Sequence, residues 1–241
     1  MSSRTSIFTP VLIVGCIFIV VSFGIRSAFG VFQIPIAEEF GWLRAEYSLA
    51  LAIQNLAWGI GQPIFGAIAE KIGDRKSILF GALLYALGLV LSAFATTPIE
   101  HQLYAWLLGF GVAGTGFGVI LAVVGRASTD ENRPMSLAIV SAMGSGGQII
   151  GPPLAEWQLG SLSWQTIFLL FACAMLAILA FLPYMRSPAM ATKAELEESM
   201  SSVLGIAFRD PSFSFIWLGF FSCGYQLGFI VSHLPAFITE L

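Results

Sequence analysis

The chain has 241 residues, of which 57% are hydrophobic and only 10% are charged, and its mean hydropathy is +0.85. A soluble domain usually carries about 25% charged residues, so this composition excludes both a soluble globule and a disordered chain. The balance of 11 basic against 14 acidic residues gives a net charge of −3, which excludes a nucleic-acid binder. Cys16, Cys173 and Cys223 lie in apolar runs without disulfide or metal spacing, so we expect neither metal nor cofactor.

A helix that crosses the hydrocarbon core of a membrane needs about 20 mostly apolar residues. Seven stretches qualify, in chain order 10–35, 46–69, 77–97, 101–125, 134–158, 164–185 and 212–238. The first stays apolar past Arg26 and lacks a small-residue cleavage site, so we expect a retained helix and not a signal peptide. The sequence therefore predicts an all-α, polytopic membrane protein.

The distribution of basic residues predicts the orientation. With the N-terminus inside, Arg44 lies outside and Arg26 lies within the membrane. The other nine basic residues then lie inside: Arg4, Lys71, Arg75, Lys76, Arg126, Arg133, Arg186, Lys193 and Arg209. Basic residues accumulate in cytoplasmic loops. We therefore expect an integral protein of the plasma (inner) membrane with a cytoplasmic N-terminus.

The most specific motif stands between the second and third predicted spans and reads Gly66-Ala-Ile-Ala-Glu70-Lys71-Ile-Gly73-Asp74-Arg75-Lys76. It resembles the loop signature of the major facilitator superfamily, Gly-x-x-x-Asp-Arg-x-Gly-x-Arg-Lys, with charge-preserving replacements at Glu70 and Lys71. The resemblance implies a cytoplasmic gate that holds two six-helix halves together in the outward-open state. We expect Gly66 to let a neighbouring helix approach closely, and Glu70 to pair with a basic residue or a helix N-terminus.

Two further resemblances refine the family. Gly147, Gly151 and Pro152 in the fifth span resemble a glycine-proline segment best known in antiporters, although Ala155-Glu156 departs from the usual Gly-Gly. The segments 26–35 and 223–235 are similar to the branch that contains oxalate/formate antiporters and monocarboxylate transporters. The resemblance implies a major-facilitator-type helical bundle.

The spans and the resemblance together predict three parts of the chain. Residues 1–186 form an N-terminal six-helix half, 187–211 a cytoplasmic linker, and 212–241 a seventh helix that begins an incomplete C-terminal half. The linker holds a capping box at Thr192–Glu195 and apolar residues at helical spacing, which fits an amphipathic helix on the membrane surface or a solvated linker. The chain stops directly after the seventh span, so we expect a longer natural form.

Arg26 is the strongest candidate for a substrate contact. A charge at membrane depth usually faces protein or a water-filled cavity, and no acidic residue stands three or four positions from Arg26 in its span. A guanidinium can grip a carboxylate with two hydrogen bonds, although a permanent ion pair is the alternative. The other candidates are polar or aromatic residues of the spans, which also suit ordinary hydrogen bonds between helices. They are Phe29, Gln33, Gln54, Trp58, Gln148 and Tyr225.

The predicted function is secondary active transport of a small organic anion, such as a monocarboxylate, by alternating access as an antiporter or symporter. The expected partners are this substrate, the lipid bilayer and, as an open question, a coupling ion; we expect no enzymatic activity. The alternatives are a seven-helix receptor, which the N-inside orientation opposes, and an intramembrane hydrolase using Ser145 and His233, which lacks the glycine two residues before the serine.

Overall fold

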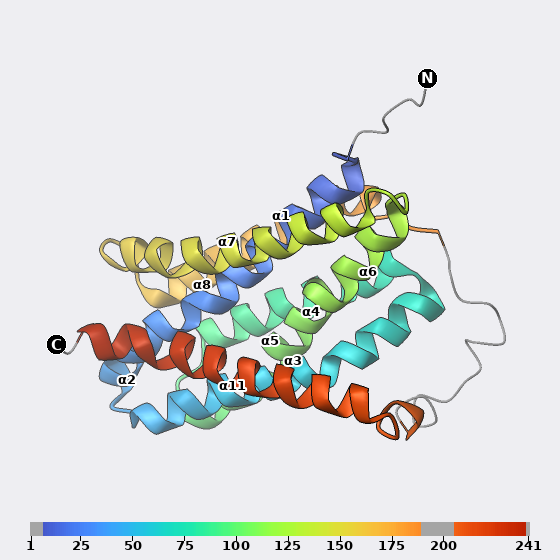
Figure 1. Ribbon diagram of the computed structural model, residues 1–241. Coiled ribbons are helices and arrows are strands. Elements are labelled where there is room, and N and C mark those ends of the chain that lie inside the picture. Colours follow the sequence, from blue (N-terminus) through green and yellow to red (C-terminus); the bar gives the residue numbers. More distant parts are fainter. Residues whose placement is uncertain (1–6, 189–204, 240–241) are drawn as a thin grey trace.

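The computed structural model describes residues 7–188 and 205–239, and within these ranges every regular element is helical (Figure 1). The elements are α1 (Pro10–Ala28), the 3₁₀ segment η1 (Phe29–Phe32), α2 (Gln33–Phe40), α3 (Arg44–Ile72), α4 (Asp74–Ala93), α5 (Pro98–Thr115), α6 (Phe117–Ala127), α7 (Arg133–Leu159), α8 (Trp164–Ala177), the 3₁₀ segment η2 (Ile178–Tyr184) and α11 (Pro211–Thr239). The expected all-α fold is therefore confirmed for the described residues. The predicted amphipathic helix of the linker falls mostly outside the described residues.

Each of the seven predicted spans lies on a helix or on consecutive helical segments. The first joins α1, η1 and α2, the fourth joins α5 and α6, and the sixth joins α8 and η2. Polar side chains fix several of the starts. Thr9, Thr97 and Ser163 precede α1, α5 and α8, and each accepts a hydrogen bond from a backbone N–H of the first turn.

Length and composition support membrane crossing for five of the seven predicted spans. These five are Pro10–Phe40, Asp74–Ala93, Pro98–Ala127, Trp164–Tyr184 and Pro211–Leu234. The helices α3 and α7 are long enough, with 29 and 27 residues, but they are less apolar. In both helices the difference comes chiefly from polar and charged side chains, such as Gln54 and Asn55 in α3 and Gln148 and Glu156 in α7, and α7 also contains several prolines and glycines.

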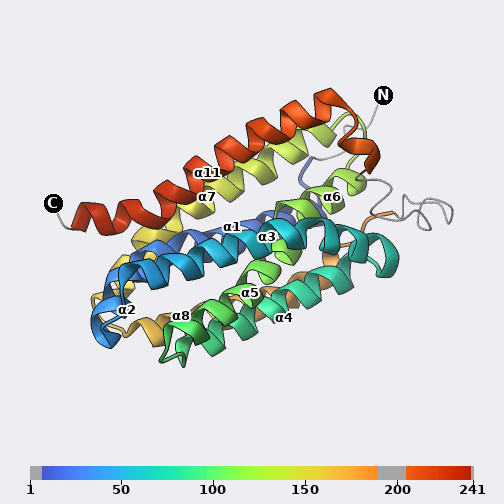
Figure 2. The same cartoon turned by 90° about the horizontal axis from the view of Figure 1, so that it is seen from below.

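Helix α11 runs along the outside of the bundle in both views (Figures 1 and 2). It contacts η1 and α3, and most of its described side chains are exposed. The most extensive contacts of the bundle join α3 with α5, α1 with α7, and α4 with α5. The N-terminus of α1 and the turn between α3 and α4 lie at one end of the bundle, which we call the N-terminal end, whereas α2 and the end of α11 lie at the opposite end.

Helices α1 and α7 meet backbone to backbone at the predicted glycine-proline segment. A Cβ atom on Gly151 would lie 2.1 Å from the carbonyl oxygen of Gly24, and one on Gly147 would lie 2.5 Å from the carbonyl oxygen of Val20. Only glycine allows this approach, because any side chain would overlap backbone atoms that cannot rotate away. Pro152 follows within the same helix. The segment thus forms a close helix–helix contact.

The close contact between α1 and α7 predicts that substitutions of two glycines in α7 change the stability of the protein to different extents. Gly151→Ala should lower the free energy of unfolding by about 1–3 kcal/mol, because the added methyl group overpacks the crossing with α1. Gly146→Ala is the matched control, since no atom lies within 4 Å of its Cβ position. A thermal-shift measurement on the detergent-solubilised protein checks this; equal melting temperatures for the two variants would contradict the role of Gly151.

Candidate functional site

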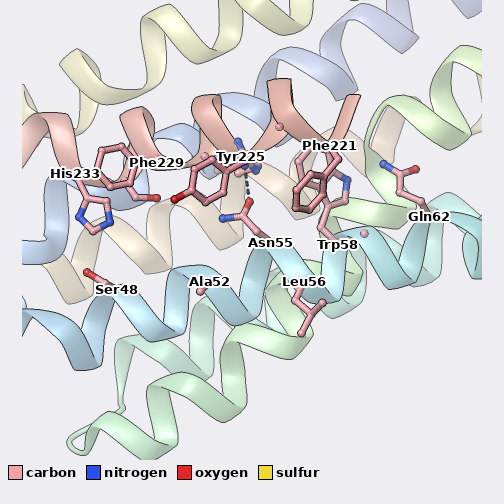
Figure 3. A pocket seen from close by; sticks show the side chains of 15 residues that line it. Ser48, Ala52, Asn55, Leu56, Trp58, Gln62, Phe221, Tyr225, Phe229 and His233 are labelled. Carbon is pink, nitrogen blue, oxygen red and sulfur yellow. Dashed lines mark hydrogen bonds between the residues drawn. The ribbon is translucent and has the colours of Figure 1, made fainter. Parts of the chain in front are cut away.

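A cavity of about 590 Å³ lies between α3 and α11, with Arg26 of α1 in its wall. Figure 3 shows polar and aromatic side chains of α3 facing aromatic side chains of α11 across this space. Helix α3 contributes Ser48, Asn55, Trp58 and Gln62, and α11 contributes Phe221, Tyr225, Phe229 and His233. The cavity therefore combines one guanidinium with a largely apolar and aromatic lining.

Arg26 is almost completely buried, with 7% of its surface exposed. Its Nη2 donates a hydrogen bond of 2.5 Å to Oδ1 of Asn55, drawn as the dashed line in Figure 3. Its Cζ lies 4.6 Å from the ring centroid of Trp58, which is a cation–π distance. No acidic side chain pairs with Arg26 in the described ranges. Both groups that support its charge are thus neutral.

Three buried donors at this site have no hydrogen-bond partner among the described residues. They are Nε of Arg26, Nε2 of Gln54 and Nε1 of Trp58. Arg26 and Gln54 also line a small space of about 10 Å³ beside the cavity, together with Asn55 and Ser232. Unpaired donors in a buried site are energetically costly and are satisfied by a ligand that brings acceptors. A carboxylate has acceptors only and matches this set.

A second cavity of about 670 Å³ adjoins the first toward the opposite end of the bundle. The two share Ser48 and His233 in their linings. Gln33 and Arg44 belong to the second, where Nε2 of Gln33 donates to Oγ of Ser48 over 2.7 Å. The two spaces together follow α3 from the middle of the bundle toward its end.

The structure brings most of the predicted substrate contacts together. Arg26, Trp58 and Tyr225 line the first cavity, whereas Phe29 and Gln54 line the small space beside it. Gln33 lines the second cavity. Phe29 is buried, and its ring centroid lies 5.4 Å from that of Phe168, so it also belongs to the core.

Gln148 lies apart from these residues. It is half-buried on α7 and lines none of the three spaces. The preceding residue, Gly147, faces the backbone of α1. One position along a helix turns a side chain by about 100°, so Gln148 points away from that contact.

Sequence reasoning missed Asn55, the hydrogen-bond partner of Arg26. A signal was present, because Ser48, Asn55 and Gln62 are spaced by seven residues, or two helical turns, and form one polar stripe on α3. All three line the cavity. The periodicity of polar residues in an apolar helix would have identified this face.

Two glycines of the loop motif behave differently from each other. Gly73 has φ +99° and ψ 148° between α3 and α4, a conformation that residues with a side chain rarely adopt. No atom lies within 4 Å of a Cβ position on Gly66. The expectation that Gly66 permits a close helix approach is therefore wrong for the described part of the chain, where open space lies beside it.

The charged residues of the motif also differ from expectation. Glu70, Lys71 and Lys76 are exposed, and Glu70 forms no ion pair with the described residues. Nη2 of Arg75 donates a hydrogen bond of 2.5 Å to the carbonyl oxygen of Pro183. This bond links α4 to the end of η2. The expected pairing of Glu70 is not observed because its side chain points to open space at the end of α3.

The adjacent residue, Asp74, forms the ion pair instead. It begins α4, and its carboxylate pairs with Nη2 of Arg126 in α6 and accepts a hydrogen bond from Oγ of Ser187. Both charged side chains are mostly buried, at 10% and 17% exposure. This pair ties α4 to the end of α6 and to the residues after η2 at the N-terminal end of the bundle.

Known proteins that are similar to this chain include membrane transporters. The family profile described as Major Facilitator Superfamily matches residues 14–241. Monocarboxylate transporter 13 of Rattus norvegicus is 25% identical over 221 residues, which cover 91% of this chain and 51% of the relative. Multidrug resistance protein MdtH of Salmonella arizonae is 33% identical over 164 residues, which cover 65% of this chain and 37% of the relative.

A solved structure supports the same fold. The human organic anion transporter MFSD10 aligns with a TM-score of 0.58 at 14% sequence identity, covering 79% of this chain and 50% of that one. At this identity the likeness shows the fold alone. The chain spans about half the length of the curated relatives Monocarboxylate transporter 13 and MFS-type transporter YcxA of Bacillus subtilis, at 51% and 54%.

The ion pair at the N-terminal end predicts that Asp74, and not Glu70, stabilises the fold. Asp74→Asn should lower the free energy of unfolding by about 1–3 kcal/mol, because Arg126 is left mostly buried without its counter-charge. Glu70→Gln is the control and should change stability by less than about 0.5 kcal/mol, as exposed substitutions usually do. Chemical denaturation of the two variants in mixed micelles measures both values. A larger loss in Glu70→Gln would refute the assignment.

Proposed function

The chain belongs to the Major Facilitator Superfamily, and we propose on this premise that the protein is a secondary active transporter that moves a small organic anion by alternating access. The family assignment favours transport over the receptor and hydrolase alternatives. The observation that carries the choice of an anion is the buried guanidinium of Arg26, which has only neutral partners within the described residues.

The substrate that suits this cavity best is a monocarboxylate with an apolar body. A buried charge without a counter-charge is costly, and a carboxylate relieves this cost with charge-assisted hydrogen bonds. The remaining wall is dominated by side chains such as Leu56, Phe221 and Phe229, which favour an apolar group over a second charge. The name of the relative Monocarboxylate transporter 13 agrees with this proposal.

The same proposal assigns roles to the parts of the chain. Residues 1–186 act as one half of the transporter, 187–211 as the linker, and α11 as the first helix of the second half. The N-terminal end, where Asp74 pairs with Arg126, faces the cytoplasm of the plasma (inner) membrane and acts as the gate. Alternating access needs two halves that rock about a central site, and the cavity between α3 and α11, the first helix of the proposed second half, supports this assignment.

Transport of radiolabelled monocarboxylates into proteoliposomes tests the proposal. Arg26→Gln should lower initial uptake by ~10–100-fold, which corresponds to the loss of charge-assisted hydrogen bonds. Arg26→Lys keeps the charge but not the planar fork, so it should retain part of the uptake. Arg133→Gln is the control, because it removes a cation beside Asp130, away from the cavity. Equal uptake by the wild type and Arg26→Gln would refute the proposal.

A further inference from the structure

Asn55 supports Arg26 from α3, and both ends of its amide group are engaged. Its Oδ1 accepts the hydrogen bond from Nη2 of Arg26, and its Nδ2 donates to the carbonyl oxygen of Leu51 over 2.9 Å. The amide cannot turn over without placing its donor against another donor. Asn55 therefore holds the guanidinium in one orientation while adding no charge to the site.

Another arginine of the same chain shows the alternative arrangement. Arg126 has a carboxylate partner, Asp74, which cancels its charge. Aspartate and asparagine have nearly the same shape, and both present an oxygen acceptor, so the two arginine sites differ chiefly in the charge of the partner. With a carboxylate at position 55, the positive charge of Arg26 would be cancelled inside the protein.

We propose that Asn55 is a positioning and specificity residue of the transport site, which orients Arg26 and leaves its charge to the carboxylate of the substrate. This inference rests on the proposed function. An aspartate at position 55 would hold its carboxylate permanently beside Nη2 of Arg26. Its effective concentration there would exceed the concentration of any dissolved substrate, so it would compete with the substrate for the guanidinium. The neutrality of residue 55 therefore decides whether the site prefers an anion.

Asn55→Asp tests this directly in the protein reconstituted into proteoliposomes. We expect the KM for the radiolabelled monocarboxylate to rise by at least ~10-fold, because the new carboxylate competes for the guanidinium. Gln62→Glu is the matched control, since it adds the same charge to the same cavity. Its carboxylate stands seven residues away, about 10 Å along the helix axis, and should raise the KM much less.

A second readout separates charge from general damage. Uptake of the neutral primary amide of the same substrate, divided by uptake of the carboxylate, should rise more in Asn55→Asp than in Gln62→Glu, because only the carboxylate at position 55 reaches the guanidinium of Arg26. Asn55→Ala removes the support without adding charge, so its KM should rise less than that of Asn55→Asp. A misfolded protein would lower the uptake of both compounds together.

The outcomes distinguish this inference from the function on which it rests. Loss of uptake in Arg26→Gln, combined with equal KM values for Asn55→Asp and Gln62→Glu, would overturn only the role of Asn55. Equal losses in Asn55→Ala and Asn55→Asp would do the same, because charge would not be the cause. Unchanged uptake in Arg26→Gln would instead overturn the proposed anion site itself.

Discussion

The positive charge of Arg26, buried between α1 and α3 against an amide and an indole ring, sets the requirements for the whole site. Such a charge is tolerated only where the surrounding groups are held in place. Around it, Tyr85 of α4 donates to the carbonyl oxygen of Ser22 over 3.1 Å, and Tyr47 of α3 donates to that of Phe29 over 2.8 Å. These bonds fix α1 on both sides of Arg26, so the unpaired donors stay aimed at fixed positions.

Arg26 and Arg126 show how the hydrogen-bond partner of a buried arginine affects its charge. Arg126 is charge-compensated by Asp74 and joins α6 to α4, which is a structural contact. Arg26 has a neutral partner, and under the proposed function its charge is left for the substrate. Removing one partner of a buried ion pair is destabilising because a charge is left uncompensated, and an ionisable residue at membrane depth is by default a candidate for function. The proposed function therefore gives Arg126 a structural role and Arg26 a role in binding.

The sequence predicted the helices well because apolar length is a local property. Continuous apolar runs located all seven helical stretches, and Arg26 stood out because a charge at that depth is rare. The polar periodicity of α3 indicates the face on which Asn55 lies, but not its partner, because the contact with Arg26 joins residues 29 positions apart in sequence. Gly66 was misjudged for a related reason, since a motif gives the residue type but not the neighbour that lies opposite it.

Among the long helices that the structure describes, α3 and α7 are the least apolar, and both use part of their surface for contacts within the bundle. The polar stripe of α3 faces the cavity, while the opposite contact of α3 with α5 remains close-packed. Helix α7 combines polar side chains such as Gln148 and Glu156 with glycines, of which Gly147 and Gly151 lie against the backbone of α1. The two helices thus differ in the contact that their less apolar faces make: α3 lines a cavity, whereas α7 approaches the backbone of α1. Under the proposed function, this makes α3 a wall of the binding site.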